Sequence, residues 1–225
     1  MFDFSGTLFR VESTERWLRA VLAETGHQLS EEELLRCAER LESAGALPGG
    51  ASPRQLPAHL EDLWQRRDLT AEQHRAAYTA LAREAGLPFA ELADPLYQRH
   101  MRPAAWRPYP DTVRTLEELR RRGVPVAVVS NIGWDLRPVF RHHGVEHLVD
   151  AYLLSFEYGA QKPSPAIFRA ACERLGLAPA DVLMVGDDRV ADAGAAALGC
   201  PVHLVEHRPA DQRPDALSAV LDLLA

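Results

Sequence analysis

The sequence predicts a doubly wound parallel α/β domain with a helical domain inserted into it. From residue 109 onward, short apolar runs alternate with amphipathic segments, the pattern of a parallel sheet covered by helices on both faces. Residues from about 13 to 101 instead place apolar side chains at helical spacing, without strand-like alternation. Polar residues follow three expected strands, and ligands bind such sheets at the carboxyl ends of their strands.

The inserted helical domain is predicted to span residues 13–104. Its first helix runs over 15–25, and Ser30 with Glu33 forms a capping box that opens a second helix ending near residue 45. The Pro- and Gly-rich stretch 48–53 indicates a loop. Thr70 with Gln73 is interpreted as another capping box, opening a helix that ends near residue 86.

The α/β core is predicted to comprise residues 1–12 and 105–225. Asp111 is expected to cap a helix that ends at Gly123, and Ser164 to start one that ends at Gly176. Strands are expected over 124–129, 148–154, 182–185 and 202–205, and further helices around Phe140 and over 190–198 and 215–224. Only two residues precede Asp3, whereas strands are usually about 5–6 residues long. Either the first strand is short, or the chain as given lacks its start.

Asp3 opens the stretch Asp3-Phe4-Ser5-Gly6-Thr7, in which an acidic residue precedes a sharp turn. This order suits a carboxylate at the end of a strand. Such a carboxylate can act as a nucleophile and split one difficult displacement into two easier steps. An Asp before a Gly-Thr turn can also simply cap the turn.

Two further segments can bind an anion. Ser130 and Asn131 follow an apolar strand, where a hydroxyl and a backbone N–H can hold a charged oxygen, although the pair also suits an ordinary turn. Lys162 precedes Pro163 and a helix start, so it is held on an extended loop. A Lys there can neutralise a carboxylate and a phosphate, while a lone loop Lys is usually a solvated surface charge.

The fourth segment carries three acidic residues. Asp187 follows an apolar strand, Asp188 comes next, and Asp192 lies one helical turn further on. Mg²⁺ commonly binds one or two carboxylates, so Asp3 with Asp187 forms the expected metal pair. Asp192 is expected to orient Lys162 or a metal-bound water. Asp188 is expected to complement a helix N-terminus.

Taken in order, these four segments resemble the haloacid dehalogenase (HAD) superfamily, most of whose members are Mg²⁺-dependent phosphatases. The resemblance implies a HAD-like Rossmannoid core with an α-helical cap closing over the site about hinges near residues 9–13 and 103–108. It further implies that Ser130 binds phosphate, that Asn131 helps to orient it, and that the backbone carbonyl of Ser5 is a third metal ligand.

Ser5 departs from the family pattern, because phosphatases usually carry a second Asp two residues after the nucleophile. That Asp protonates the leaving oxygen and later activates water, which is worth roughly 10²–10⁴-fold in rate. A Ser hydroxyl does not titrate near neutral pH, so turnover of an aspartyl-phosphate on Asp3 is expected to be slow.

We expect a hydrolase that acts on a small phosphorylated metabolite. Two alternatives stay open: a weakly active or inactive HAD fold that binds a phosphorylated ligand or partner, and a metal-free 2-haloacid dehalogenase. In the latter, Arg10 or Arg16 could match an essential Arg of the cap, but dehalogenases replace the acid at the place of Asp187, which this chain retains.

Composition and charge limit the partners and the cellular compartment that we expect. A net charge of −7 argues against general nucleic-acid binding. The three cysteines are scattered and are interpreted as buried thiols in a reducing cytoplasm, and the histidines as a scatter without a metal site. No signal peptide or bilayer-spanning run is apparent, so we expect a cytoplasmic monomer or homodimer without a membrane partner.

Overall fold

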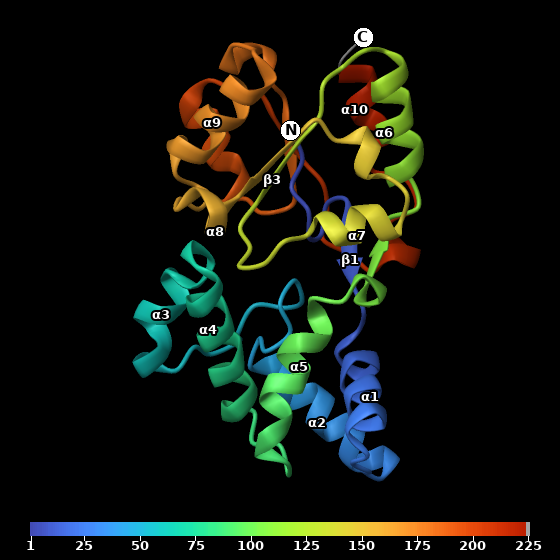
Figure 1. The fold of residues 1–225 in the computed structure, drawn as a ribbon, viewed down its shortest axis with the longest axis vertical. Helices are drawn as coiled ribbons and strands as arrows, with labels where there is room; N and C mark the ends of the chain where they lie inside the picture. The colour runs from blue at the N-terminus through green and yellow to red at the C-terminus, as the bar shows by residue number, and fades with distance from the viewer. Residues whose placement is uncertain (224–225) are drawn as a thin grey trace. The chain divides into compact units, whose positions relative to one another are not determined.

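The structure is a computed structural model that describes residues 1–223. Two compact units make up the chain: a core unit, formed by residues 1–10 and the chain from 108 onward, and a helical unit formed by residues 11–107 (Figure 1). The two connections between them run through β1 (Phe9–Val11) and β2 (Trp106–Pro108).

The core unit contains a parallel sheet. Its named strands form two parallel pairs, β3 (Ala127–Ser130) with β4 (Ala151–Leu154) and β5 (Met184–Gly186) with β6 (Val202–Leu204). The first three residues lie between these pairs: the Phe2 N–H donates to the Ala127 carbonyl, and the Asp3 N–H donates to the Val185 carbonyl. The spatial order is therefore β4, β3, residues 1–3, β5, β6, which places residues 1–3 at the centre of the sheet.

Helices cover both faces of this sheet, as the alternating pattern predicts. The α-helices of the core unit are α6 (Thr112–Arg121), α7 (Arg137–His142), α8 (Ser155–Tyr158), α9 (Pro165–Leu175) and α10 (Ser218–Leu223). The 3₁₀ helices are η5 (Glu146–Leu148), η6 (Pro179–Asp181), η7 (Asp192–Leu198) and η8 (Ala210–Gln212). Figure 1 shows α9 on one side of β3 and α6 with α10 on the other. The predicted α/β fold is confirmed.

Some predicted elements of the core differ in their details. Asp111 precedes α6 but makes no side-chain cap to it; its Oδ2 instead accepts the N–H groups of Ala216 and Leu217, each at 2.6 Å. This capping prediction was wrong because a distant segment competes for the carboxylate. The helix expected over 190–198 is the 3₁₀ helix η7, since the preceding residues form a turn held by the Asp188 carboxylate. The helix expected over 215–224 is α10, and residue 224 lies outside the described residues.

Between β1 and β2, the helical unit consists of helices and connecting loops, and residues 12–105 contain no β-strand. Its α-helices are α1 (Thr14–Thr25), α2 (Glu31–Ser43), α3 (Glu61–Gln65), α4 (Ala71–Glu84) and α5 (Ala93–His100). Its 3₁₀ helices are η1 (Ala58–Leu60), η2 (Arg67–Leu69), η3 (Ala90–Leu92) and η4 (Pro103–Ala105). Trp17 of α1 is fully buried, and its indole N–H donates to the Leu96 carbonyl of α5 at 2.9 Å, which ties these two helices together.

Local capping explains where these helices begin. The predicted box at Ser30 is confirmed: the Glu33 N–H donates to Ser30 Oγ, and the Ser30 N–H donates to the Glu33 carboxylate. The second box is only half formed. Thr70 Oγ1 accepts the Gln73 N–H at 3.1 Å, but Gln73 Oε1 is buried without a hydrogen-bond partner among the described residues.

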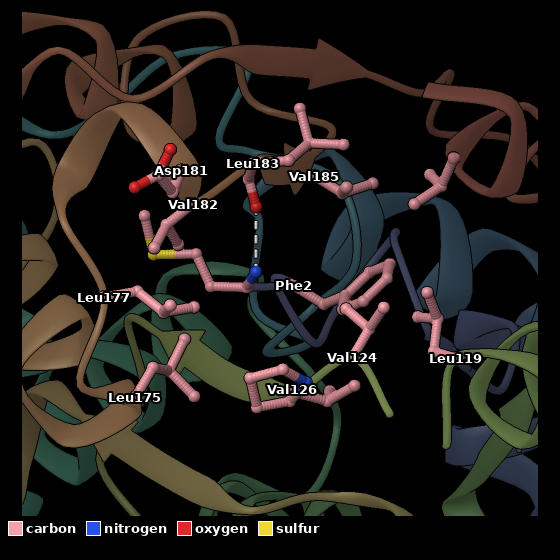
Figure 2. Close-up of a pocket in the computed structure, with 13 residues that line it drawn as sticks. Phe2, Leu119, Val124, Val126, Leu175, Leu177, Asp181, Val182, Leu183 and Val185 are labelled. Carbon is pink, nitrogen blue, oxygen red and sulfur yellow. Dashed lines mark hydrogen bonds between the residues drawn. The ribbon is translucent and has the colours of Figure 1, made fainter. Parts of the chain in front are cut away.

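An apolar pocket of about 40 Å³ lies at the amino-terminal end of the central segment (Figure 2). Phe2, Leu119, Val126 and Leu177 are among its lining residues, and the Met1 ammonium donates to the Leu183 carbonyl at 2.8 Å beside it. This pocket is at the opposite end of the sheet from the predicted site. None of the described helices is both long and apolar enough to cross a membrane.

Candidate active site

Three predicted site residues meet at the carboxyl edge of the core sheet. Asp3 ends the central segment, with its N–H donated to the Val185 carbonyl at 2.9 Å. Ser130 is the last residue of β3, and Asp187 follows directly after β5. Because neighbouring parallel strands end on the same edge, side chains 127 and 184 residues apart in sequence from Asp3 gather around it.

The loop after Asp3 needs its glycine. Gly6 has a φ of +85°, a conformation that costs glycine little. A Cβ at this position would also lie 2.4 Å from Asp187 Oδ2 and 2.2 Å from His207 Nδ1. The N–H groups of Leu8 and Phe9 both donate to the Phe4 carbonyl, which closes the turn. The glycine therefore lets the backbone pass directly beside Asp187.

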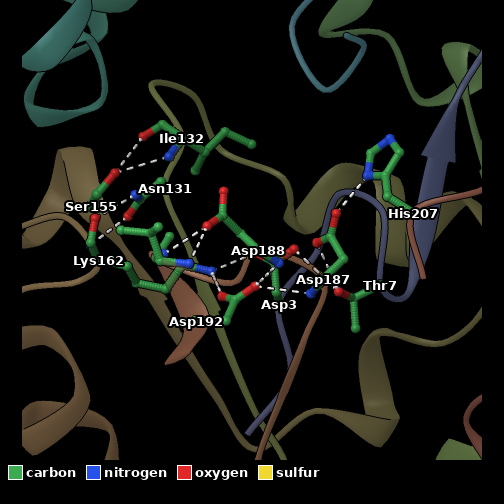
Figure 3. A network of polar contacts seen from close by, with 12 residues as sticks. Asp3, Thr7, Asn131, Ile132, Ser155, Lys162, Asp187, Asp188, Asp192 and His207 are labelled. Carbon is green, nitrogen blue, oxygen red and sulfur yellow. Dashed lines mark hydrogen bonds and ion pairs between the residues drawn. The ribbon is translucent and has the colours of Figure 1, made fainter. Parts of the chain in front are cut away.

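Lys162 joins two carboxylates inside the protein. Its side chain is buried, with Nζ 2.6 Å from Asp3 Oδ1 and 2.5 Å from Asp192 Oδ1 (Figure 3). Lys162 is thus not the solvated surface charge that a lone loop Lys usually is. Its loop is held by Asn131, whose Oδ1 accepts the Lys162 N–H at 2.6 Å and whose Nδ2 donates to the Lys162 carbonyl at 2.9 Å. Asn131 therefore positions Lys162.

The Asp192 and Asp188 carboxylates, four residues apart in the chain, accept hydrogen bonds from different groups. Asp192 Oδ2 accepts the N–H groups of Asp187 and Asp188, at 3.0 and 2.9 Å, while its Oδ1 contacts Lys162. Asp188 Oδ1 instead accepts the N–H groups of Val190 and Ala191. Asp192 therefore connects Lys162 to the loop that carries Asp187, and Asp188 shapes the turn before η7.

Ser130 precedes Asn131 in the chain, and Ser5 follows Asp3 by two residues. Ser130 is buried at the end of β3, and the loop that follows it is held by Ser155, whose Oγ accepts the Ile132 N–H at 2.9 Å (Figure 3). Ser5 is half-buried in the turn two residues after Asp3. Both lie close in sequence to the ends of neighbouring strands, where the site forms.

Burial and charge act in opposite directions on these groups. Burial raises the pKa of Asp3 well above its usual range, while the nearby Lys162 ammonium opposes the shift. Burial disfavours the charged form of Lys162, but the Asp192 and Asp3 carboxylates outweigh it and raise its pKa overall. Burial also disfavours the charged form of Asp187, but a hydrogen bond from His207 lowers its pKa. The Lys162 ammonium thus stays charged and compensates the carboxylates.

The acidic side chains fit a small divalent cation. Oxygen atoms of Asp3, Asp187 and Asp192 all lie within 4.8 Å of one another. Thr7 Oγ1 lies between two of these groups, 3.4 Å from Asp3 Oδ2 and 3.2 Å from Asp187 Oδ1. Both oxygens of Asp192 already bind Lys162 and backbone N–H groups. Asp3 and Asp187 are therefore the carboxylates suited to Mg²⁺, which prefers oxygen ligands.

Two contacts at this site were missed in the sequence. Thr7 lies within the first motif but drew no attention, although its hydroxyl contacts both carboxylates. His207 lies 2.5 Å from Asp187 Oδ2, and the Arg10 side chain contacts its other ring nitrogen. The prediction that the histidines are scattered did not foresee this contact of His207. No local sequence pattern links His207 to Asp187, which lies 20 residues earlier in the chain.

Comparisons with known proteins agree with this geometry. The family model described as haloacid dehalogenase-like hydrolase matches residues 1–199. The chain belongs to this family. The family's name covers hydrolases. Asp3, Ser130 and Asp187, which suggested the family by their order in the sequence, stand at the ends of neighbouring strands, and Lys162 contacts Asp3.

Individual relatives show how far the likeness extends. Haloacid dehalogenase-like hydrolase domain-containing protein 3 of Mus musculus is 36% identical over 128 residues, covering 55% of this chain and 51% of that protein. Glyceraldehyde 3-phosphate phosphatase of Methanopyrus kandleri is 30% identical over 195 residues, covering 83% of this chain and 74% of that protein. The structure of L-2-haloacid dehalogenase from Xanthobacter autotrophicus has a TM-score of 0.64 and 22% identity, covering 100% of this chain and 82% of that one.

The likeness to these relatives is limited in length and in sequence identity. The chain spans about half the length of the mouse protein and of other curated relatives that it matches, 51% and 56% for two of them. At 22% identity, the likeness to the dehalogenase structure shows the fold alone. The comparisons therefore show the family and the fold.

Proposed function

We propose that this chain is a Mg²⁺-dependent phosphatase that hydrolyses a small phosphorylated metabolite through an aspartyl-phosphate on Asp3. The observation that carries this proposal is the buried Lys162 ammonium between Asp3 and Asp192, beside Asp187. A carboxylate, a fixed cation and a second carboxylate at one sheet edge suit attack on an anionic phosphorus centre. The phosphatase name of the Methanopyrus relative supports the same chemistry.

In the first step, a carboxylate oxygen of Asp3 forms a bond to phosphorus while the bond from phosphorus to the leaving oxygen breaks. The leaving oxygen departs with the bonding electrons and takes a proton from solvent water. Lys162 compensates negative charge on Asp3 and on the phosphoryl oxygens. Ser130 is assigned to bind a phosphoryl oxygen, and Asn131 contributes by holding Lys162 in place.

The residues that would hold Mg²⁺ are Asp3, Asp187 and the backbone carbonyl of Ser5. When bound, the cation supplies positive charge that offsets the carboxylates and the phosphoryl group. Asp192 is left out of this set because its oxygens already bind Lys162 and two backbone N–H groups. Its part is to orient Lys162 and the loop that carries Asp187.

In the second step, a water oxygen attacks phosphorus and the bond from phosphorus to Asp3 breaks. This step returns the Asp3 carboxylate and releases inorganic phosphate. The attacking water loses a proton to solvent, because Ser5 offers no titrating group at the place where the family usually has an Asp. We therefore assign slow turnover to the second step. Ser5 also cannot protonate the leaving oxygen in the first step, so esters with good leaving groups should form the aspartyl-phosphate fastest.

We assign substrate selection to the helical unit, whose bounds were predicted from the sequence as residues 13–104. All motif residues that account for the phosphoryl chemistry come from the core unit. The contacts that distinguish one phosphorylated metabolite from another therefore have to come largely from other residues, and an inserted cap is the expected source.

A substrate panel with four arms tests the proposed reaction. The four arms are wild type with Mg²⁺, wild type with EDTA, Asp3→Asn with Mg²⁺ and Asp188→Asn with Mg²⁺. Each arm is assayed against phosphate esters and against 2-haloacids. We expect phosphate release that EDTA and Asp3→Asn abolish and that Asp188→Asn preserves, because Asp188 only shapes a turn. Halide release without metal would favour the dehalogenase instead. Binding of phosphate esters without turnover would favour a binding protein.

A further inference from the structure

A buried arginine from the C-terminal part of the core unit holds the loop that carries the predicted nucleophile. Arg213 follows η8, and one of its terminal nitrogens donates to the Gly6 carbonyl at 2.6 Å. The other donates to the Thr7 carbonyl at 2.5 Å. The planar guanidinium presents several donors in a rigid fork, so one side chain can bind two successive carbonyl groups.

The guanidinium itself is fixed in place. Its central carbon lies 3.2 Å from the centre of the Tyr109 ring, and the Arg213 side chain is only 4% exposed. The Tyr109 hydroxyl donates to the Arg208 carbonyl at 2.7 Å, which fixes the ring. The Tyr109 N–H donates to the Leu8 carbonyl, so the same residue also contacts the nucleophile loop directly. Three successive carbonyl groups of this loop, at residues 6, 7 and 8, are thereby held from one side.

Stability alone does not account for this arrangement. Within residues 1–223, the Arg213 guanidinium forms no ion pair and its Nε is buried without a hydrogen-bond partner. Burial lowers the pKa of Arg213, which reflects the cost of removing the charge from water. A buried charge with incomplete hydrogen bonding is weak evidence for stabilisation, and a fixed geometry is a better explanation of its presence.

The held loop is in direct contact with the site. While the Thr7 carbonyl binds Arg213, the Thr7 hydroxyl contacts both Asp3 and Asp187. Gly6, whose carbonyl binds the same guanidinium, leaves no room for a Cβ, which would lie 2.4 Å from Asp187 Oδ2. A displacement of this backbone would therefore move the Thr7 hydroxyl and the space available to Asp187 together.

We propose that Arg213 is a positioning residue of the active site, which sets the relative placement of Asp3, Thr7 and Asp187 through the backbone of residues 6 and 7. The inference builds on the proposed phosphatase and extends it to a residue outside the segment 1–199 that the family model matches. Arg213 acts only through the loop, so its removal should lower kcat and leave KM nearly unchanged.

The test compares Arg213→Ala with Arg208→Ala, an exposed arginine of the same segment paired with Glu206. With an aryl phosphate and Mg²⁺, we expect Arg213→Ala to lose about 10²-fold in kcat, the usual cost of a displacement near 1 Å. Millimolar guanidinium should restore part of the lost kcat in Arg213→Ala and have no effect on wild type. Arg208→Ala should behave as wild type.

A second readout does not depend on turnover. The ¹³C carboxyl signals of Asp3 and Asp187 should shift in Arg213→Ala and return toward wild type with guanidinium. If wild type hydrolyses no phosphate ester, the proposed function fails, and these signals alone decide the role of Arg213. Unshifted signals, or a variant with a lower melting temperature but unchanged kcat, would overturn the positioning role.

A lysine variant covers the case in which Arg213→Ala does not fold. A Lys ammonium keeps the positive charge but is a point donor that cannot reproduce the planar fork across two carbonyl groups. Arg213→Lys should therefore fold and still lose kcat without guanidinium rescue. Full activity in this variant would show that charge is sufficient and would contradict the proposal.

Discussion

At the scale of residues, the buried Lys162 ammonium lies in a cluster of three carboxylates. Lys162 contacts Asp3 and Asp192 directly, and Asp187 belongs to the same acidic cluster. A single ammonium cannot compensate three negative charges, and this excess of negative charge supports the proposed Mg²⁺ site. The same excess makes each carboxylate sensitive to the loss of its partners.

The metal assignment leads to a prediction for Asp187→Asn. This change should weaken Mg²⁺ binding by roughly tenfold or more, since even supporting residues of a metal site are worth about 10–100-fold. The fold should remain intact, because the substitution relieves repulsion between close carboxylates. Calorimetric titration with Mg²⁺ measures the affinity, and Asp188→Asn is the matched control. Equal affinity in both variants would remove Asp187 from the ligand set.

The missing acid–base group leads to a prediction for Ser5→Asp. A carboxyl at this place should speed hydrolysis of phosphate esters by up to about 10²-fold, the low end of acid–base effects, because the surroundings are not arranged for it. Esters with poor leaving groups should gain most, since they depend on protonation. Steady-state rates of Ser5→Asp and Ser5→Ala, each against wild type, provide the measurement. An unchanged rate in a folded Ser5→Asp that still binds Mg²⁺ would assign Ser5 to another chemistry.

At the scale of elements, α4 and α5 of the helical unit enclose buried histidines. His74 of α4 hydrogen-bonds the Tyr97 hydroxyl of α5 at 2.8 Å, and His100 bonds the Tyr97 carbonyl. Both rings are buried, and burial lowers the pKa of His100 to about 3 and that of His74 well below its usual range. Asp68 lies 3.8 Å from His74 and would partly offset a charge there, so His100 is the cleaner probe.

These lowered pKa values predict acid sensitivity. In the unfolded chain a histidine takes up a proton as the pH falls through about 6.5, whereas folded His100 does not until about pH 3. The unfolded state therefore binds more protons in this window, and stability falls as pH falls, by about 1.4 kcal/mol per pH unit for one fully buried histidine. Urea unfolding at pH 7 and pH 5 should show this loss.

The control for this prediction is a pair of variants. His100→Gln should reduce the pH dependence of the urea midpoint, while Gln at the exposed His142 of α7 should retain it. An unchanged pH dependence in His100→Gln would mean that other groups cause the acid sensitivity.

At the scale of the whole molecule, the chain leaves the core unit after residue 10 and returns to it at residue 108. The two ends of the helical unit meet, since the Glu12 N–H donates to the Ala105 carbonyl at 2.7 Å. Arg99 of α5 also pairs with Glu12, with its Nε 2.8 Å from the carboxylate. A segment whose ends are adjacent can be inserted into a loop without disturbing the host sheet.

This organisation predicts that residues 11–107 fold alone. The excised segment should give a helical circular dichroism spectrum and a cooperative thermal transition, because Trp17 and the other large buried side chains of α1, α4 and α5 pack within it. Trp17→Ala in the same segment should cost about 3–5 kcal/mol and serves as the destabilised reference. A spectrum without helix in the unmutated segment would show that the unit needs the core to fold.

Local signals made much of this protein predictable. The alternating apolar runs predicted the parallel core, and Ser30 with Glu33 predicted the start of α2, because strand and helix periods and N-terminal caps depend on residues a few positions apart. Asp3, Lys162 and Asp187 could be selected because each stands at a strand end or a stiff loop in a recognisable order. Their roles in catalysis stay predictions until the variants are assayed.

The sequence by itself determined the fold class, the order of the motifs and the residues most suited to phosphoryl chemistry. Only the tertiary structure decided that Asn131 hydrogen-bonds the backbone of Lys162 and that His207 contacts Asp187. It alone also decided that Arg213 binds the carbonyl groups of residues 6 and 7. It also decided that Asp111 binds a segment 105 residues away instead of capping α6. Such contacts join segments that share no period or spacing, so they arise only when the packed sheet brings distant chain segments within hydrogen-bonding distance.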